Sequence, residues 1–230
     1  MVVFYLLGDM GSGNEEQISV ADALSEHIKK NPAKTPFICG LGDNIYEEGC
    51  YSVDDKQFIK KFEIPYKDIN NKIKFYMCLG NHDYGNTLFN KKGNSLNQIE
   101  YGILSQKNGK KWVMPNNYYT FNKGDIAFFI LDTNFNNHSK DEINTQYEYF
   151  VDEINKSKKK WKILIGHHTL RSIGGHGNAD ERMKSFFYRL LDVCDFDLYI
   201  CGHDHNKQVI NTTLNNKKIT LIVCGTGGKK

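Results

Sequence analysis

The stretch Leu198-Tyr199-Ile200-Cys201-Gly202-His203-Asp204-His205 is a short apolar run that passes through glycine into three polar side chains. Its apolar part is too short for a core helix and predicts a buried strand. Four other apolar runs end in glycine followed at once by a potential metal ligand: Gly8-Asp9, Gly42-Asp43, Gly80-Asn81 and Gly166-His167. Glycine lets the backbone turn tightly, and the carboxyl ends of parallel strands share one edge. Five such ends carrying only Asp, Asn and His predict a metal site.

Seven short apolar runs alternate with helical patterns along the chain. The runs, predicted as strands buried on both faces, are 2–7, 37–41, 75–79, 126–131, 162–165, 198–201 and 219–223. Helical stripes are predicted at 18–28, 54–62, 144–154 and 179–193. This alternation predicts βαβ units of an α/β fold, and no repeat or linker divides the chain, so one domain is expected over 1–230. The irregular segment 84–117, with a weak helical stretch at 96–105, is expected to be an insertion bordering the site.

Composition and charge exclude several classes of protein. The 30 Lys and Arg residues against 27 Asp and Glu residues leave a charge of +3, too small to indicate nucleic acid or an acidic membrane surface. No apolar stretch reaches the ~18 residues needed to span a bilayer, and the first residues lack the features of a signal peptide. The six cysteines form no C-x-x-C pair, as in a reduced compartment, which favours the cytoplasm.

The histidines gather at the predicted strand ends. Six of the eight lie in Gly80-Asn81-His82-Asp83, in Gly166-His167-His168 through His176, and in Gly202-His203-Asp204-His205. On a strand, His203 and His205 would point the same way, because side-chain direction has a period of two. His27 and His138 lie elsewhere and are given no role.

The candidate ligands share one kind of chemistry. They are carboxylates, an amide oxygen and imidazoles, with no thiolate, which favours Fe, Mn or Zn over a structural cysteine-bound zinc. Seven or eight candidates are too many for one ion. Two ions bridged by one carboxylate would use them all, and that arrangement suits in-line displacement at phosphorus.

These blocks resemble the calcineurin-like metallophosphoesterases, and more narrowly the small, tartrate-resistant (type 5-like) purple acid phosphatases. In the family's order they read Gly8-Asp9-Met10-Gly11, Gly42-Asp43-Asn44-Ile45-Tyr46, Gly80-Asn81-His82-Asp83, Gly166-His167-His168 and Gly202-His203-Asp204-His205. Residues 131–133, 172–177 and 199–206 are also similar. Most of the wider superfamily has His at the position of Gly11 and lacks a tyrosine ligand, whereas Tyr46 follows Asp43 by three. The resemblance implies a four-layer α-β-β-α sandwich of the metallo-dependent phosphatase type.

The resemblance also implies a binuclear metal centre. It places Fe(III) with Asp9, Asp43, Tyr46 and His205, where the tyrosinate gives the purple colour. It places a second ion, Fe(II), Zn(II) or Mn(II), with Asp43, Asn81, His167 and His203, so that Asp43 bridges the two ions. The implied activity is an acid phosphatase, in which a metal-activated hydroxide attacks the phosphorus of a small phosphorylated substrate in line.

The remaining polar residues of these blocks receive roles in substrate binding and catalysis. The resemblance gives Asn81, His82 and His176 contacts with the phosphate, and one of the two histidines protonates the leaving oxygen. His168 is expected to line the pocket and Asp83 to orient His82, with a purely structural role as the alternative for both. Asp204 is expected either to support the ligands from behind or to be exposed.

The chain departs from the family at two places and leaves two other functions open. The segment 134–144 is shorter than the loop over the site in mammalian members, so regulation by cleavage is not carried over. The family usually continues through further strands beyond Lys230, so the sequence is a minimal form or a fragment. The alternatives are a phosphodiesterase or nucleotide hydrolase of the same superfamily, and a non-catalytic binding protein on the same fold.

Overall fold

Three of the predicted apolar runs, together with one further short strand, form a parallel sheet in the amino-terminal half. The structure is a computed structural model that describes residues 1–85 and 93–229. Its first sheet has the order β1-β2-β3-β4, and all its neighbouring strands are parallel. The strands are β1 (Phe4–Leu7), β2 (Phe37–Leu41), β3 (Phe75–Cys78) and β4 (Trp112–Val113).

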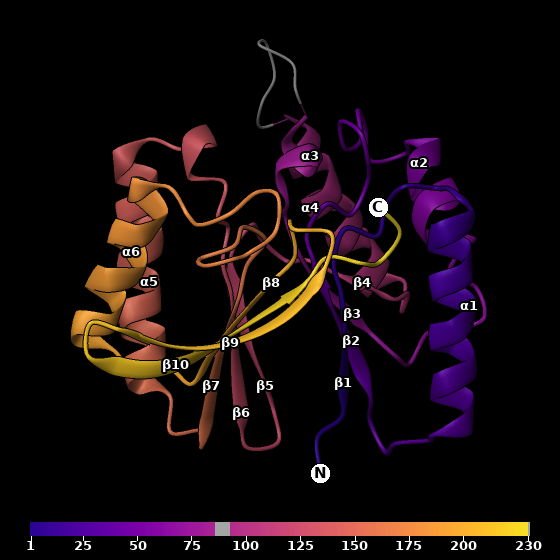
Figure 1. The fold of residues 1–230 in the computed structure, drawn as a ribbon. Coiled ribbons are helices and arrows are strands. Elements are labelled where there is room, and N and C mark those ends of the chain that lie inside the picture. The colour runs from indigo at the N-terminus through magenta and orange to yellow at the C-terminus, as the bar shows by residue number, and fades with distance from the viewer. Residues whose placement is uncertain (86–92, 230) are drawn as a thin grey trace.

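A second, mixed sheet lies against the first (Figure 1). Its order is β5-β6-β7-β8-β10-β9, in which β6, β7, β8 and β10 are parallel and the two outer pairs are antiparallel. The strands are β5 (Tyr119–Lys123), β6 (Ile126–Ile130), β7 (Trp161–Ile165), β8 (Leu198–Cys201), β9 (Lys207–Leu214) and β10 (Lys217–Cys224). All seven predicted strands are therefore present.

Helices cover the outer faces of both sheets, so that the molecule has four layers (Figure 1). The first sheet is covered by α1 (Glu15–Lys30), with α2 (Lys56–Phe58), the π-helical turn η1 (Ile59–Glu63) and α4 (Gly93–Lys107) on the same side. The second is covered by α5 (Lys140–Lys156) and α6 (Glu181–Val193). Two short elements, α3 (Asn81–Tyr84) and the 3-10 turn η2 (Phe135–Asn137), follow β3 and β6. The predicted four-layer α/β fold is confirmed.

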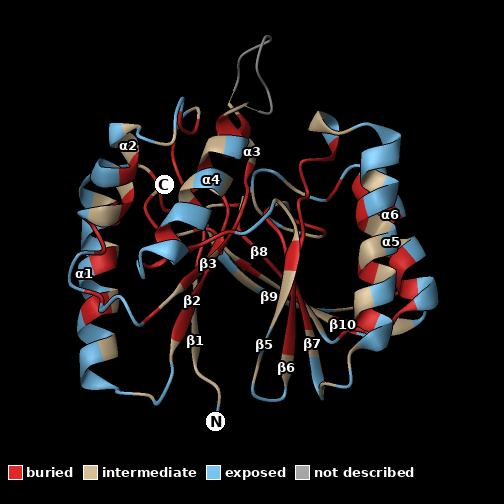
Figure 2. Ribbon diagram, turned by 180° about the vertical axis from the view of Figure 1, so that it is seen from behind, coloured by how far each residue is buried: buried red, intermediate tan, exposed pale blue. Residues whose placement is uncertain are grey.

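The period-two geometry of a strand explains why the runs are apolar on both faces. In β6, Phe128 and Ile130 enter the core between the two sheets, whereas Ala127 and Phe129 enter the core between the second sheet and its helices. The Phe128 ring makes edge-to-face contacts with Phe4 at 5.3 Å and Phe37 at 5.4 Å, which join the sheets. Figure 2 shows that the buried strands lie between helices whose outer faces are exposed.

The helices begin where local capping chemistry allows. In α1, Asn14 accepts a hydrogen bond from the Gln17 amide, and in α5, Ser139 and Glu142 form a reciprocal capping box. The predicted stripe of α1 is partly wrong, because Ile18 is 45% exposed and Gln17 is buried instead. The helix predicted at 54–62 is a short α-helix continued by a π turn.

The predictions missed β4, β5 and β9 and the short α3. In β9 exposed and half-buried positions alternate at the edge of the sheet, and β4 has two residues, so neither presents a long apolar run. The insertion predicted at 84–117 contains α4, which is longer than the predicted stretch at 96–105. Part of it, 86–92, lies outside the described residues.

Two further sequence predictions can be compared with the structure. No described helix is both long and apolar enough to cross a membrane. Five cysteines are buried and Cys224 is half-buried, and all six are free thiols. His27 lies exposed on α1.

Candidate metal centre

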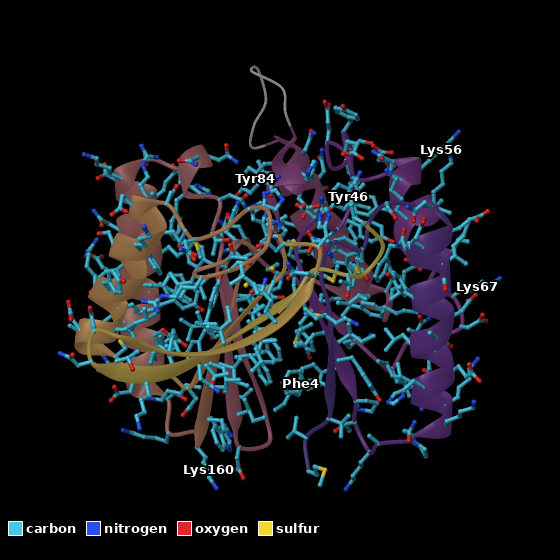
Figure 3. The ribbon with its side chains drawn as sticks, in the orientation of Figure 1. Phe4, Tyr46, Lys56, Lys67, Tyr84 and Lys160 are labelled. Carbon is cyan, nitrogen blue, oxygen red and sulfur yellow. The ribbon has the colours of Figure 1, made fainter. Side chains whose placement is uncertain are left out.

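The predicted ligands come from strand ends of both sheets and meet between them. Asp9, Asp43 and Asn81 follow β1, β2 and β3 of the first sheet, and His167 and His203 follow β7 and β8 of the second. Figure 3 shows Tyr46 at the end of the strands opposite Phe4 and Lys160. The predicted ligands therefore meet at a seam between two sheets, and not along the edge of a single parallel sheet as the sequence suggested.

One group of predicted ligands is centred on Tyr46. Its hydroxyl lies 3.1 Å from Asp9 Oδ1 and 3.3 Å from His205 Nε2, and His205 Nε2 lies 3.5 Å from Asp9 Oδ1. Asp9 and Tyr46 are buried. A carboxylate, a phenol and an imidazole thus point at one place.

The other group is centred on His167. Its Nε2 lies 3.1 Å from Asn81 Oδ1, 3.1 Å from His203 Nδ1 and 3.5 Å from Asp43 Oδ2. Ligand atoms of Asp9, Asp43 and His167 all lie within 4.8 Å of one another, and all three residues are buried. Because Asp43 is near both groups, the two groups form a continuous cluster that could hold metal.

Hydrogen-bond accounting around His167 shows that the cluster fits cations. His167 Nδ1 lies 2.8 Å from the Leu41 carbonyl, so Nδ1 carries a proton and the Nε2 of a neutral ring is a bare lone pair. That lone pair faces the acceptor oxygens of Asn81 and Asp43. A cation between these atoms would satisfy all of them, and a ring held by a backbone carbonyl is the usual support for a histidine ligand.

The electrostatics of the cluster's own side chains agree with a cation site. Burial alone would lower the pKa of His167, but the Asp43 and Asp9 carboxylates outweigh it and the pKa is raised, so the cluster favours positive charge at this ring. Burial, followed by repulsion from neighbouring His167, depresses the pKa of His203 far below its usual range. Burial, reinforced by Asp43 and Asp9, raises the pKa of the Tyr46 hydroxyl. Cation binding by Tyr46 would therefore release a proton.

The backbone at the ligands is unusual, and not in the way that the sequence predicted. Asp9, Asp43 and His203 themselves have positive φ angles of 58°, 51° and 71°, which cost on the order of 1–3 kcal/mol each. Among the five glycines before ligands, Gly42 has a positive φ. At Gly202 the reason is space, because an added Cβ would lie 2.5 Å from Asp9 Oδ2. Glycine at these positions chiefly allows neighbouring backbone segments and a carboxylate to approach each other closely.

The period-two prediction for His203 and His205 is wrong. Strand β8 ends at Cys201, and the backbone bends through residues 203–206. His203 lies against His167, whereas His205 lies against Tyr46. The two imidazoles reach different groups because the chain turns between them.

A cleft of about 600 Å³ opens beside the cluster. Its lining includes the predicted substrate residues, further residues of the loops that follow the second sheet's strands, and one residue of α6: Asn81, His82, Thr133, Asn134, His168, His176, Asp180 and Met183. His82 Nδ1 lies 2.6 Å from the Glu47 carbonyl, and its backbone N–H donates to Asp43. The His176 ring lies over His203 with 4.0 Å between centroids. Two candidate proton donors and the cluster therefore share one cleft.

Two carboxylates hold the backbone around the ligands. Asp204 is buried and accepts hydrogen bonds from the His176 amide at 2.8 Å and from the Ser172 hydroxyl, so it is not exposed. Asp83 was expected either to orient His82 or to have a purely structural role, and its hydrogen bonds are those of a structural role. It accepts from the amides of Gly80, Asn44 and Ile45, and burial followed by Asp43 raises its pKa to about 6.

The sequence reasoning gave no role to a polar network beside the cleft. Asp132, which follows β6, accepts hydrogen bonds from the Tyr84 hydroxyl and from His138 Nε2, the latter at 2.9 Å. Thr133 and Asn134 come next and line the cleft. The signal was available, because Asp132 and Thr133 follow an apolar run as the ligands do. Burial lowers the pKa of His168, which contacts Thr133, to about 3.

Comparison with known proteins gives consistent matches. A family model described as calcineurin-like phosphoesterase matches residues 2–207. Purple acid phosphatase 7 of Arabidopsis thaliana is 29% identical, with 98% of this chain and 70% of the relative covered. Tartrate-resistant acid phosphatase type 5 of Homo sapiens is also 29% identical, covering 83% of this chain and 61% of that protein. The structure of GAP50, the anchor in the inner membrane complex of Plasmodium, matches with a TM-score of 0.78 at 25% identity, covering 98% and 72%. This chain thus spans only part of each relative.

Proposed function

Because this chain belongs to the calcineurin-like phosphoesterase family, we propose that it is a binuclear-metal acid phosphatase that hydrolyses small phosphomonoesters. The observation that carries the proposal is the position of the Tyr46 hydroxyl between Asp9 and His205. A phenol, a carboxylate and an imidazole at hydrogen-bond distance form a donor set suited to a ferric ion.

The proposed ligands divide as the two groups do. Asp9, Tyr46 and His205 hold Fe(III), Asn81, His167 and His203 hold Fe(II), Zn(II) or Mn(II), and Asp43 serves both. Such a pair of cations would supply Lewis acidity to the phosphoryl oxygens and lower the pKa of a water beside them. The protein's own part is to hold the ester in the cleft and to move a proton.

His82 is the proposed proton donor to the leaving oxygen. Its Nδ1 lies 2.6 Å from the Glu47 carbonyl and carries a proton in both charge states of the ring. Nε2 is therefore the nitrogen that gains and gives up the transferable proton. His176, an exposed residue that lines the cleft, and Asn81, through its amide nitrogen, are proposed to contact the phosphate, as is His168.

The iron-loaded protein is expected to absorb visible light through tyrosinate-to-iron charge transfer. Tyr46→Phe should abolish the band, because it removes the phenolic oxygen and leaves the buried ring in place. The measurement is the visible spectrum of the reconstituted protein, with Tyr51→Phe, an exposed tyrosine, as the matched control. If the iron-loaded protein is colourless while zinc- or manganese-loaded protein is active, the purple-enzyme assignment is refuted. The assignment as a metal-dependent hydrolase would then still stand.

Rates on nitrophenyl esters separate the proposal from its nearest alternative. We expect the metal-loaded protein to hydrolyse p-nitrophenyl phosphate at least about tenfold faster than bis(p-nitrophenyl) phosphate, since an acid phosphatase favours a monoester. The reverse preference would support a phosphodiesterase or nucleotide hydrolase.

Variants test whether this turnover takes place in the cleft. His82→Ala should slow an alkyl phosphate by about a hundredfold or more and slow p-nitrophenyl phosphate less, because nitrophenolate leaves without protonation. His27→Ala, on the exposed face of α1, is the control.

The likeness to GAP50, an anchor, makes a non-catalytic role the third possibility. No turnover of any ester by protein that binds two metal ions would favour it.

A further inference from the structure

Thr133 sits where β6 ends, and its hydroxyl oxygen is surrounded by hydrogen-bonding groups. The backbone N–H of His167 lies 3.2 Å from Oγ1, and the N–H of His168 lies 3.1 Å from it. The third neighbour is His168 Nδ1 at 2.8 Å. Thr133 is 4% exposed, so the three protein groups account for its hydrogen bonding.

The donors and acceptors around this oxygen fix the direction of each bond. A hydroxyl has two lone pairs and one hydrogen. The two backbone N–H groups can only donate, and they use both lone pairs. The hydroxyl hydrogen is therefore donated to His168 Nδ1, which must be an acceptor without a proton.

This bond determines the tautomer of His168. A ring whose Nδ1 accepts a hydrogen bond is uncharged and carries its proton on Nε2. Nε2 has no hydrogen-bond partner among residues 1–85 and 93–229, and the half-buried ring lines the cleft. Its centroid is 4.7 Å from that of His203, one of the proposed ligands. A neutral N–H donor thus borders the proposed phosphate position.

In their neutral forms, His82 and His168 carry the ring proton on opposite nitrogens. His82 Nδ1 faces a carbonyl, so the Nε2 of its neutral ring is bare and can exchange a proton. His168 Nδ1 faces a hydroxyl hydrogen, so its Nε2 already bears a proton. The first arrangement suits proton transfer and the second suits binding an anionic oxygen.

We propose that Thr133 is a positioning residue that holds His168 in the Nε2–H tautomer, so that His168 donates a hydrogen bond to a phosphoryl oxygen of the substrate. The inference rests on the proposed function, because the phosphoryl group is placed beside the metal ligands. Tyr199 supports the same geometry, since its hydroxyl donates to the His168 carbonyl at 2.6 Å.

The tautomer can be measured without turnover. In zinc-loaded protein with ¹⁵N-labelled histidine, long-range ¹H–¹⁵N correlations should show His168 with a bare Nδ1 and a protonated Nε2. The signal is assigned by its loss in His168→Gln. Added inorganic phosphate should shift the Nε2–H resonance. A protonated Nδ1, or an unmoved Nε2–H at phosphate concentrations that inhibit or saturate the site, would overturn the proposal.

Kinetic constants test the link between the two residues. Thr133→Val should raise KM and the inhibition constant of phosphate by about tenfold with kcat little changed, because the donor acts on bound phosphate in ground and transition states alike. Thr133→Ser should restore both to within about twofold, and His168→Gln, which keeps an N–H donor, should remain closer to wild type than His168→Ala.

Each other outcome has a definite reading. A loss of kcat and metal content with KM unchanged would make Thr133 merely structural, since its hydroxyl also binds the His167 amide. An unaltered His168 tautomer in Thr133→Val would likewise refute the proposal. If wild-type protein hydrolyses no ester yet shows the Nε2–H tautomer and its shift with phosphate, the proposed activity fails and the binding role stands.

Discussion

Asp43→Asn is expected to lower kcat/KM on a phosphomonoester by at least about a thousandfold, the equivalent of about 4 kcal/mol of transition-state stabilisation. The substitution keeps the shape of the side chain and removes the charge proposed to serve both cations. Asp43 lies 3.5 Å from His167 Nε2 and forms part of the buried carboxylate pair with Asp9. Metal analysis should show fewer than two ions per chain, and enzyme assays on p-nitrophenyl phosphate should show the loss.

The same substitution is expected to leave the metal-free fold intact or make it more stable. Asp9 and Asp43 are buried like charges within 4.8 Å of each other, and their repulsion is relieved when one becomes neutral. Urea unfolding of metal-free protein should therefore give a free energy of unfolding at least equal to that of wild type. Asp54→Asn, on an exposed carboxylate, is the control for both measurements. Wild-type activity in Asp43→Asn would exclude the proposed centre.

Asp83→Asn is expected to reduce the free energy of unfolding by about 3 kcal/mol. The carboxylate is fully buried and accepts from the Gly80 amide at 2.8 Å, the Asn44 amide at 2.9 Å and Gln98 Nε2 at 2.8 Å. It thereby ties together the turns after β2 and β3 and the helix α4. Asparagine would place an NH₂ group among donors, so at least one buried N–H would lose its acceptor and face another donor.

Urea unfolding at neutral pH without metal measures this effect separately from cation binding. Asp22→Asn, on the exposed face of α1, should change the free energy by less than about 0.5 kcal/mol. A loss below about 1 kcal/mol in Asp83→Asn would mean that water replaces the carboxylate and that the turns are held by other contacts.

Residues next to a strand end were the ones that the sequence could identify. Asp9, Asp43, Asn81, His167 and His203 each follow an apolar run and a glycine, and this pattern survives in a linear sequence. His205 came from the same strand-end pattern, as the second histidine after Gly202, whereas Tyr46 came from the family resemblance. The structure brings all seven into one cluster at the seam between the sheets.

The same reasoning misjudged residues whose partners lie elsewhere in the chain. Asp83 was assigned either to its neighbour His82 or to a structural role without a named partner, and it binds Asn44, 39 positions earlier. Thr133 was passed over, although its hydroxyl meets the His168 ring 35 positions later. Buried polar groups take whatever partner the fold brings within reach, and sequence spacing does not record it.

The sequence by itself determined the kind of donor and the strand end at which each one emerges, because apolar periodicity and covalent neighbours are local properties. Only the tertiary structure decided which donors meet: Tyr46 with His205, 159 positions apart, and Asp9 with His203, 194 positions apart. It also decided that both sheets of the sandwich supply the donors. The physical reason is that the packing of aromatic and aliphatic faces between the sheets sets the distance across the seam, and that packing sums contacts from the whole chain.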